Sequence, residues 1–405
     1  MRVPDDQDKV IRVAARGDGV TLGGRHVPFG APGDTLRADG TVAPGVHHQQ
    51  PPCRHFPECG GCQLQHLDDA SYASFVRDRV VGALTGQGID AEVREAIVSP
   101  PRTRRRATLH AERRGRQVLM GFTAQASHQL VDMQECWILL PELYALVAPL
   151  RGLLAAFLPG SGRVDIHLAR VDQGIDVLIQ GSLGAGLATI EAITGFARRH
   201  ALARLSIDRG LGPEAQWEPE PVTVTLGGVP VPFPPGGFLQ ATAEGEAALV
   251  EVARTVCGKA TTTADLFTGL GTFALALSGK VYAAEGARDA ILSLKGAAAM
   301  AQRMVFADHR DLYRRPLTTA ELDRFEAVVL DPPRAGARDQ MPGLAASVVP
   351  RIAYISCNPS SFARDAKLLI EGGHHLDWVQ PVGQFRWSTH VELAAAFSRP
   401  GSRPA

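Results

Sequence analysis

The stretch Asp265-Leu-Phe-Thr-Gly-Leu-Gly-Thr-Phe273 decides the fold of this chain. It ends an apolar run and contains two glycines, which let the backbone bend sharply and approach a ligand where a side chain would clash. We expect a strand to end here and a helix over residues 272–277 to offer its N-terminal amides to a ligand. A Gly-x-Gly pair alone is weak evidence, because a purely structural turn is at least as common.

Two further strand-to-loop turns follow, in Leu330-Asp-Pro-Pro-Arg-Ala-Gly336 and Tyr354-Ile-Ser-Cys-Asn-Pro359. The alternation of helical and apolar patterns around them predicts strands at residues 262–267, 281–285, 327–331 and 351–357, and a helix at 361–370. We therefore expect a doubly wound α/β domain over residues 241–405. The loops at the carboxyl ends of its strands should meet in one crevice, where such sheets bind ligands.

The preceding residues suggest two further parts, which fits a length of 405 residues at roughly 100–200 residues per domain. Residues 1–46 alternate short apolar runs with glycine turns, which predicts a small β-module. Residues 47–240 predict an α+β middle domain. Its expected elements are strands at 164–170 and 175–179, a hairpin at 222–231 and a helix at 141–158.

The composition limits the choice of partners and compartment. A formal net charge of +0 argues against a uniformly cationic surface, so any nucleic-acid contact must come from local patches. Arginines between positions 102 and 116 form such a patch, although a solvated charged face explains them equally well. No stretch reaches the roughly 18 apolar residues of a membrane span, so we expect a soluble cytoplasmic protein.

Two carboxylates follow predicted strands of the C-terminal sheet. Glu285 ends the strand after the glycine turn, where doubly wound folds place a carboxylate against ribose hydroxyls. Asp331 lies on a loop that Pro332 and Pro333 stiffen, which suits a residue of a binding site. A strand-ending turn with an ordinary N-cap acid is the alternative for Asp331. Together the two acids favour a nucleoside cofactor.

Cys357 ends a predicted strand just before a predicted helix. A lone cysteine is more often a small apolar core residue, but the amide dipoles at this position could favour a thiolate. Near the end of the chain, Glu392 follows His390 and precedes an apolar run. A thiol and a carboxylate in one crevice would form a nucleophile and base pair, although Glu392 alone is more often a surface acid.

A second group of cysteines predicts a metal centre. Cys53-x5-Cys59-Gly-Gly-Cys62 combines two close spacings, and Cys136 is available as a fourth ligand. Six cysteines in a chain of this size do not form a disulfide scaffold, and thiolates bind iron–sulfur clusters or zinc. Spacing does not decide between these two metals. Cys257 is left over as a structural residue.

These motifs together resemble the bacterial S-adenosylmethionine-dependent RNA 5-methyluridine methyltransferases, and most closely the iron–sulfur branch that acts on 23S rRNA. The resemblance covers nearly the whole chain. The N-terminal β-module resembles a truncated form of the family's RNA-binding domain. The motifs are the four cysteines, Gly237-Phe-Leu-Gln240, Asp265-x-Phe-x-Gly-x-Gly271, Asp331-Pro-Pro-Arg-Ala-Gly336, Ser356-Cys-Asn-Pro359 and His390-Val-Glu392.

The resemblance implies a class I methyltransferase domain and a role for each motif. Cys357 matches the nucleophile that adds to uracil C6, and Glu392 matches the base that removes the C5 proton. The cysteines match the ligands of a [4Fe-4S] cluster. It implies 23S rRNA as the partner, with no membrane and no obligatory protein partner. The residues expected to bind S-adenosylmethionine are Gln240, Phe267, Gly269, Gly271, Thr272, Glu285, Asp311 and Asp331.

Three alternatives remain open at this level. The same chemistry could act on tRNA, although that branch lacks the cysteine group. The chain could be a non-catalytic iron–sulfur RNA-binding module, but the presence of both Cys357 and Glu392 argues against this. Methylation of a small molecule would leave the arginines and the additional domains unexplained.

Overall fold

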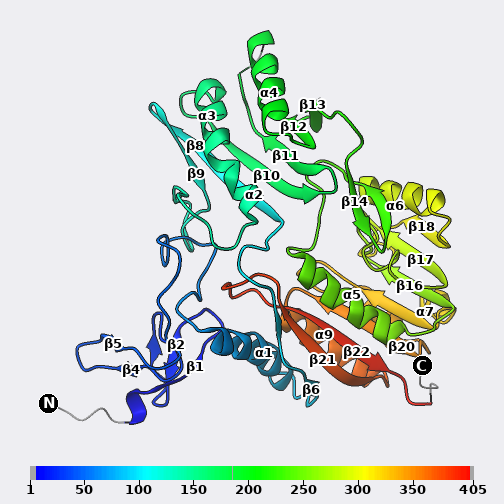
Figure 1. Ribbon diagram of the computed structural model, residues 1–405. Coiled ribbons are helices and arrows are strands. Elements are labelled where there is room, and N and C mark those ends of the chain that lie inside the picture. The colour runs from blue at the N-terminus through cyan, green and yellow to red at the C-terminus, as the bar shows by residue number, and fades with distance from the viewer. Residues whose placement is uncertain (1–5, 185, 402–405) are drawn as a thin grey trace.

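A large nine-stranded sheet forms the C-terminal part of the protein in the computed structural model, which describes residues 6–184 and 186–401. Its strands are β6 (Glu92–Val93), β7 (Ile97–Val98), β16 (Thr262–Leu266), β17 (Lys280–Glu285), β18 (Val305–His309), β19 (Ala327–Leu330), β20 (Arg351–Ser356), β21 (His375–Gly383) and β22 (Glu392–Ser398). They lie in the order β18-β17-β16-β19-β20-β22-β21-β6, and β7 also pairs with β21 (Figure 1).

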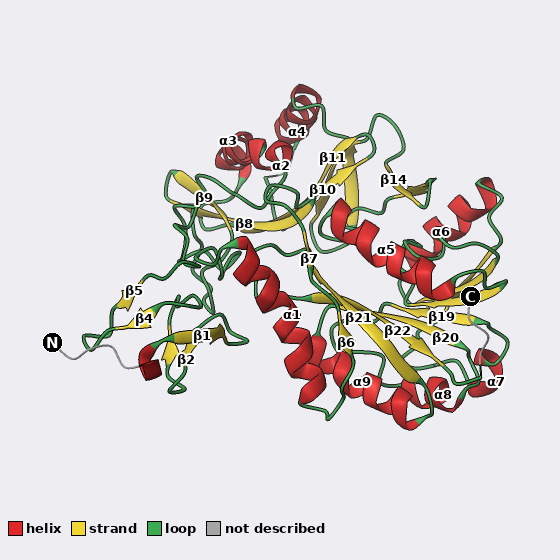
Figure 2. Ribbon diagram, turned by 60° about the horizontal axis from the view of Figure 1, so that its bottom comes forward, coloured by secondary structure: helices red, strands yellow, loops and turns green. Residues whose placement is uncertain are grey.

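The five strands from β18 to β20 are parallel, and helices cover both faces of the sheet (Figure 2). One face packs against α5 (Ala243–Cys257) and α6 (Arg288–Met300). The other packs against α1 (Asp69–Thr85), α7 (Thr319–Leu322), α8 (Met341–Ala346) and α9 (Pro359–Glu371). Burial on both faces explains why these strands are continuous apolar runs in the sequence. The strand order reverses at β16, which places a ligand crevice at the carboxyl ends of β16 and β19.

A second sheet has six strands in the order β13-β12-β11-β10-β8-β9 and forms the top of the molecule in Figure 1. Helices α2, α3 and α4 share a hydrophobic core with one of its faces. The bounds are β8 (Arg106–Arg114), β9 (Gln117–Gly121), α2 (Pro141–Ala145), α3 (Val147–Phe157), β10 (Arg163–Val171), β11 (Gly174–Gln180), α4 (Leu187–Arg199), β12 (Arg204–Asp208) and β13 (Pro213–Trp217). The hairpin of β14 (Thr223–Leu226) and β15 (Val229–Pro232) packs instead with the α5 and α6 side of the large sheet.

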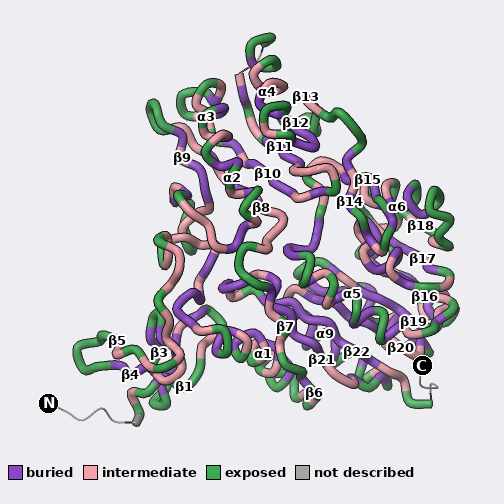
Figure 3. The backbone as a smooth tube through the Cα atoms, in the orientation of Figure 1, coloured by how far each residue is buried: buried purple, intermediate pink, exposed green. Residues whose placement is uncertain are grey.

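The N-terminal segment is a small module with little core of its own. It contains the 3-10 helix η1 (Asp6–Asp8), a sheet of β1 (Val10–Val13), β2 (Gly19–Thr21) and β3 (His26–Val27), and a hairpin of β4 (Thr35–Leu36) and β5 (Val42–Ala43). Figure 3 shows that this hairpin is mostly exposed, whereas buried residues concentrate in the two large sheets. The module lies beside α1 in the ribbon view (Figure 1).

The predicted strands of the C-terminal sheet agree with the structure to within one residue at each end, but the helix predicted over residues 272–277 was wrong. Residues 269–276 form a series of hydrogen-bonded turns. Two positive φ angles, 55° at Gly269 and 93° at Gly271, are incompatible with a regular helix start. The predicted helix at 141–158 is divided into α2 and α3, which meet at Leu146.

Strands β6 and β7 come from the segment before the six-stranded sheet, yet they pair with β21 of the large sheet. The predicted division into residues 1–46, 47–240 and 241–405 stays a prediction, because residues 92–98 lie in the predicted middle domain but pair with a strand of the C-terminal domain. Across residues 6–184 and 186–401, no helix combines the length and the apolar character needed to cross a membrane.

Candidate active site

A crevice of about 960 Å³ lies between strand β8 of the six-stranded sheet and the loops at the carboxyl ends of β16, β17, β19 and β20. Its volume is in the range that holds a cofactor or a small ligand. Loops far apart in the sequence thus form one site, as the doubly wound fold predicts. The predicted site residues that line it are Gln240, Phe267, Gly269, Thr272, Glu285, Asp331, Cys357 and Glu392.

Cys357 follows β20 directly, in the short connection to α9. Burial raises the pKa of its thiol to about 11, and the neighbouring Glu392 and Asp331 carboxyls raise it further in the same direction. The expectation that the helix dipole would favour a thiolate was therefore wrong for the protein alone. Desolvation and two acidic neighbours outweigh the α9 amides, whose first turn is capped by the Asn358 side chain.

Glu392 is the first residue of β22 and is only 6% exposed. Burial raises the pKa of its carboxyl to about 7, whereas the Gln384 amide and the Arg106 guanidinium lower it. A carboxyl that titrates near neutral pH can accept a proton and release it again, which is the property required of a general base.

Two carboxylates hold the glycine turn, one buried beneath it and one at the crevice. Asp265 is completely buried, and its Oδ2 accepts hydrogen bonds from Thr268 Oγ1 at 2.5 Å and from the Ala274 amide at 2.8 Å. Glu285 lines the crevice, and its Oε2 accepts a hydrogen bond from the Gly269 amide at 3.0 Å. Asp265 therefore shapes the turn from behind, while Glu285 connects the turn to the next strand.

Gln240 and Asp331 meet within the crevice. Gln240 Nε2 donates a hydrogen bond to Asp331 Oδ2 at 3.3 Å. Burial raises the pKa of Asp331 well above its ordinary value, and the carboxyls of Glu392, Asp265 and Glu285 raise it further. Several acids are therefore gathered around one space, which favours a cationic or hydroxyl-rich ligand.

Two residues predicted to contact the cofactor do not line the crevice. Gly271 faces α6, where a Cβ at this glycine would lie 2.4 Å from Leu294 Cδ1. Asp311 lies beyond β18, and its Oδ1 accepts a hydrogen bond from the Tyr313 amide at 3.0 Å. Gly271 therefore has a packing role in this conformation, and Asp311 holds the loop next to the crevice.

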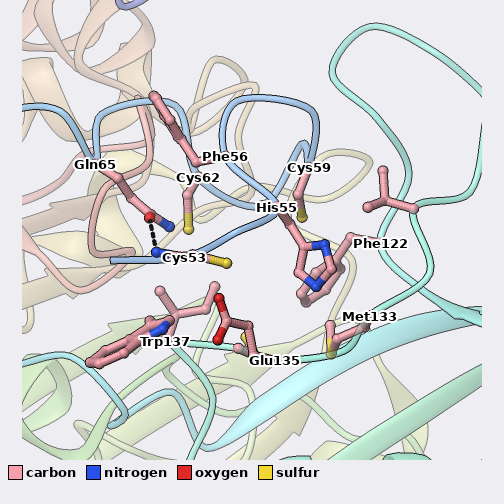
Figure 4. A pocket seen from close by; sticks show the side chains of 14 residues that line it. Cys53, His55, Phe56, Cys59, Cys62, Gln65, Phe122, Met133, Glu135 and Trp137 are labelled. Carbon is pink, nitrogen blue, oxygen red and sulfur yellow. Dashed lines mark hydrogen bonds between the residues drawn. The ribbon is translucent and has the colours of Figure 1, made fainter. Parts of the chain in front are cut away.

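Cys53, Cys59, Cys62 and Cys136 line a single pocket beside this crevice, and all four are free thiols. Figure 4 shows the side chains of Cys53, Cys59 and Cys62 turned toward the same space. Burial raises the pKa of each of the four thiols, that of Cys53 to about 11, and thiol neighbours raise several of them further. The described parts of the chain contain no group of three or more His, Cys, Asp or Glu side chains placed to hold a metal ion.

The arginines between positions 102 and 116 are used largely for contacts within the protein, which leaves fewer of them to contact nucleic acid. Arg102 stacks over Trp137, Arg105 pairs with Glu246, and Arg113 donates to the carbonyls of Ala155 and Leu158. Of the predicted arginines, those that line the crevice are Arg104 and Arg106. Arg104 lies over the rings of Phe122 and Phe385, and Arg106 lies over Phe238.

Comparisons with known proteins agree with this architecture. A family model described as tRNA (Uracil-5-)-methyltransferase matches residues 232–399. An RNA methyltransferase of Zymomonas mobilis is 49% identical over 394 residues, which cover 96% of this chain and 99% of that protein. A 23S rRNA (uracil(1939)-C(5))-methyltransferase of Halomonas elongata is 30% identical over 402 residues, which cover 91% of this chain and 80% of that protein.

The chain belongs to the RNA (uracil-5-)-methyltransferase family. The enzyme is therefore an S-adenosylmethionine-dependent RNA methyltransferase. Its fold resembles that of Pyrococcus abyssi tRNA (uracil-54, C5)-methyltransferase in complex with S-adenosyl-L-homocysteine, with a TM-score of 0.71 and 23% identity over 96% of this chain and 99% of that one. This likeness confirms the predicted α/β class I fold.

Sequence reasoning missed several residues of this methyltransferase that line or support the crevice. Phe238 is 60% exposed at its mouth, and Gln384 is buried behind Gln240. The position of Phe238 within the Gly237-Phe-Leu-Gln240 motif could have indicated it. The proximity of Arg106 to Glu392 could not be found in this way, because β8 and β22 are far apart in the sequence and are brought together only by the fold.

Proposed function

We propose that this enzyme methylates C5 of a specific uridine in 23S rRNA through a covalent bond between Cys357 and uracil C6. One observation carries the proposal: Cys357 and Glu392 line the same crevice as Gln240, Glu285 and Asp331. A nucleophile, a base and a set of acids suited to a cationic nucleoside donor are therefore within reach of one bound base. The ribosomal substrate is supported by the relative from Halomonas elongata, whose name specifies 23S rRNA.

The proposed reaction requires covalent catalysis because C5 of uracil is a weak nucleophile. Addition of the Cys357 thiolate to C6 moves the electrons of the C5–C6 double bond into an enolate, which makes C5 nucleophilic. S-adenosylmethionine, when bound, supplies an electrophilic methyl group on a positively charged sulfur. Glu392 then takes the proton from C5, the C5–C6 double bond re-forms, and the Cys357 sulfur leaves C6.

Burial and neighbouring charges set the protonation states of the two proposed catalytic side chains before substrates bind. The pKa of Cys357 is raised to about 11, so its thiol is protonated at neutral pH and has to lose its proton within the substrate complex. The pKa of Glu392 is raised to about 7, so a substantial fraction of its carboxyl is already ionised at neutral pH. The positive sulfonium of S-adenosylmethionine, when bound, would favour both anions.

The donor would be held by the acids and glycines of the crevice wall. We assign this role to Gln240, Phe267, Gly269, Thr272, Glu285 and Asp331, with Gly271 and Asp311 acting on the surrounding loops. The target base has to be unpaired or turned out of its helix to reach Cys357, at a cost of a few kcal/mol. Arg104, Arg106 and Phe238 at the opposite wall offer cationic and aromatic contacts for such a nucleotide.

We further propose that Cys53, Cys59, Cys62 and Cys136 hold a [4Fe-4S] cluster. The donor set fits, because four thiols around one pocket are the ligands that such clusters use, with Cys62 buried and the other three half-buried. Their raised pKa values mean that they need a metal charge to become thiolates. We assign this cluster a structural role beside the RNA-facing wall, because Gly61 and Phe122 line both the cysteine pocket and the crevice.

The remaining assignments follow from the same proposal. In this proposal the RNA-binding part of the enzyme consists of the segments around the cysteine pocket, strand β8 and the N-terminal module. RNA is the partner, and we expect the enzyme in the cytoplasm, where ribosomal RNA is modified. No obligatory protein partner is part of the proposal.

The Cys357→Ala variant tests the catalytic assignment. Without the sulfur, methyl transfer should fall by at least about four orders of magnitude, because the covalent route is closed. Binding of S-adenosylhomocysteine should change less than about threefold. The measurement is incorporation of labelled methyl groups into separated 23S rRNA and tRNA, followed by nucleoside analysis. Normal turnover by the variant would refute the role of the thiol, and 5-methyluridine found in tRNA alone would refute the ribosomal substrate.

The Cys62→Ser variant tests the cluster, with Cys257→Ser as the matched control. Both cysteines are buried, but Cys257 is the last residue of α5, lies in the core and does not line the cysteine pocket. Wild type and the control, purified without oxygen, should be brown and contain about four irons per chain, whereas Cys62→Ser should lose iron and visible absorption. Colourless wild type with one zinc per chain would contradict the cluster.

A further inference from the structure

Gln384 occupies a buried position between the proposed base and the donor-binding wall. It follows β21 directly, and its side chain is 2% exposed. Its Nε2 donates a hydrogen bond to Gln240 Oε1 at 2.8 Å, and its amide is near enough to the Glu392 carboxyl to lower the pKa of that group. Gln240 continues the chain by donating to Asp331 at 3.3 Å. One buried amide therefore contacts residues proposed for two different tasks.

The orientation of this amide is set by a backbone group that can only donate. The Ala241 N–H donates to Gln384 Oε1 at 2.9 Å, so the Nε2 of Gln384 must face Gln240 and Glu392. Gln240 then has to present its oxygen to Gln384 and its Nε2 to Asp331. A flip of either amide would bring two donors or two acceptors face to face, which is costly at buried positions.

Packing holds the same side chain in place. A Cβ at Gly245, in the first turn of α5, would lie 2.7 Å from Gln384 Cβ and 3.0 Å from its Oε1. Gln384 can approach the helix this closely only because residue 245 is a glycine. The backbone of Gln240 is also held by the residue just before β8, because Arg105 Nε donates to the Gln240 carbonyl at 3.0 Å.

We propose that Gln384 is a positioning residue that orients both Gln240 and Glu392. It would thereby hold the donor-binding wall and the proton acceptor in fixed positions relative to each other. The inference rests on the proposed function. It adds a residue that touches neither reactant and that acts through two residues that do. Without the Gln384 amide, Gln240 would be free to flip and Glu392 would lose a neighbour that stabilises its charged form.

The proposal predicts a change in pH dependence. Groups facing Glu392 from the surrounding elements are Arg106 on β8, Asp331 after β19 and Cys357 after β20. All three remain in a Gln384 variant. The Gln384 amide stabilises the ionised form of Glu392, so its removal should shift the acid limb of the pH profile, where release of free 5-methyluridine slows, toward higher pH.

The test compares Gln384→Glu, Gln384→Met and the control Gln380→Met in single turnovers from pH 6 to pH 9, and measures how fast rRNA with free 5-methyluridine is released from the enzyme. Glu keeps an acceptor for the Ala241 amide and, when ionised, has no donor and adds a negative charge beside Glu392, so this variant preserves the backbone contact. Met removes both functions without adding charge. The control loses a buried glutamine of β21, four residues before Gln384, whose Nε2 donates to the Glu95 carbonyl at 2.6 Å.

Both Gln384 variants should lose activity about 10- to 100-fold at pH 7, as expected for small misplacements of reacting groups, and should recover part of it at pH 9. Gln380→Met should retain the wild-type acid limb. An unmoved acid limb in both Gln384 variants, or an equal loss at every pH, would overturn the proposal. Wild type that forms no 5-methyluridine in RNA would instead overturn the proposed function, and the role of Gln384 with it.

Discussion

At the residue scale, sequence reasoning selected the two residues that we propose to be reactive, but not the pKa values of their side chains. Cys357 and Glu392 could be predicted from their motifs and their places next to apolar strands. Their pKa values could not, because these depend on burial and on neighbours such as Arg106 and Asp331 that only the fold provides. The helix dipole at α9 is a local feature of the sequence, and it is outweighed by this environment.

The raised pKa of Glu392 gives a direct expectation for pH dependence. Glu392 must be ionised to accept the C5 proton, and its folded pKa is about 7, above the ordinary glutamate value of about 4.3. Release of RNA carrying free 5-methyluridine from the covalent adduct should therefore be slow at pH 5.5 and become faster through pH 7. Ionisation of Cys357 can only add to this rise at higher pH. Single-turnover rates at saturating donor and RNA provide the measurement, and a rate that is already maximal at pH 5.5 would contradict the assignment of the base.

At the element scale, the parallel strands were predictable, and the glycine turn was predictable only in part. Buried parallel strands are apolar on both faces, so β16, β17, β19 and β20 are recognisable as continuous runs. The helix expected after Gly271 is absent because the backbone takes a φ of 93° there and packs against Leu294 of α6. That contact joins two segments of the chain and has no local sequence pattern.

Gly271→Ala tests this account of the turn, with Gly296→Ala in α6 as the control. A Cβ at position 271 would meet Leu294 at 2.4 Å on a backbone of positive φ, whereas a Cβ at Gly296 would meet nothing within 4 Å. We expect Gly271→Ala to lower the free energy of unfolding by about 2 kcal/mol or more. Gly296→Ala should raise it by up to about 1 kcal/mol. Urea unfolding of both variants gives the answer, and an unchanged midpoint for Gly271→Ala would contradict the close packing.

At the scale of the whole molecule, the site exists because two sheets meet. Strand β8 supplies Arg104 and Arg106 from its first residues and the loop before it, and the large sheet supplies Cys357 and Glu392. The joining segment is held by Arg105, which pairs with Glu246 of α5. Sequence motifs predicted the contents of each part, but the composition of the shared crevice required the arrangement of both sheets.

The central claim is a temporary bond between Cys357 and C6 of the target uracil. Its most direct test is to incubate the enzyme and S-adenosylmethionine with 23S rRNA in which uridine is replaced by 5-fluorouridine, whose C5 has no proton for Glu392 to remove. The complex should then be trapped, and peptide mass spectrometry should locate the nucleotide on Cys357, with no trapping by Cys357→Ala. A nucleotide attached to another cysteine, or no covalent complex from an enzyme that methylates normal rRNA, would contradict the account.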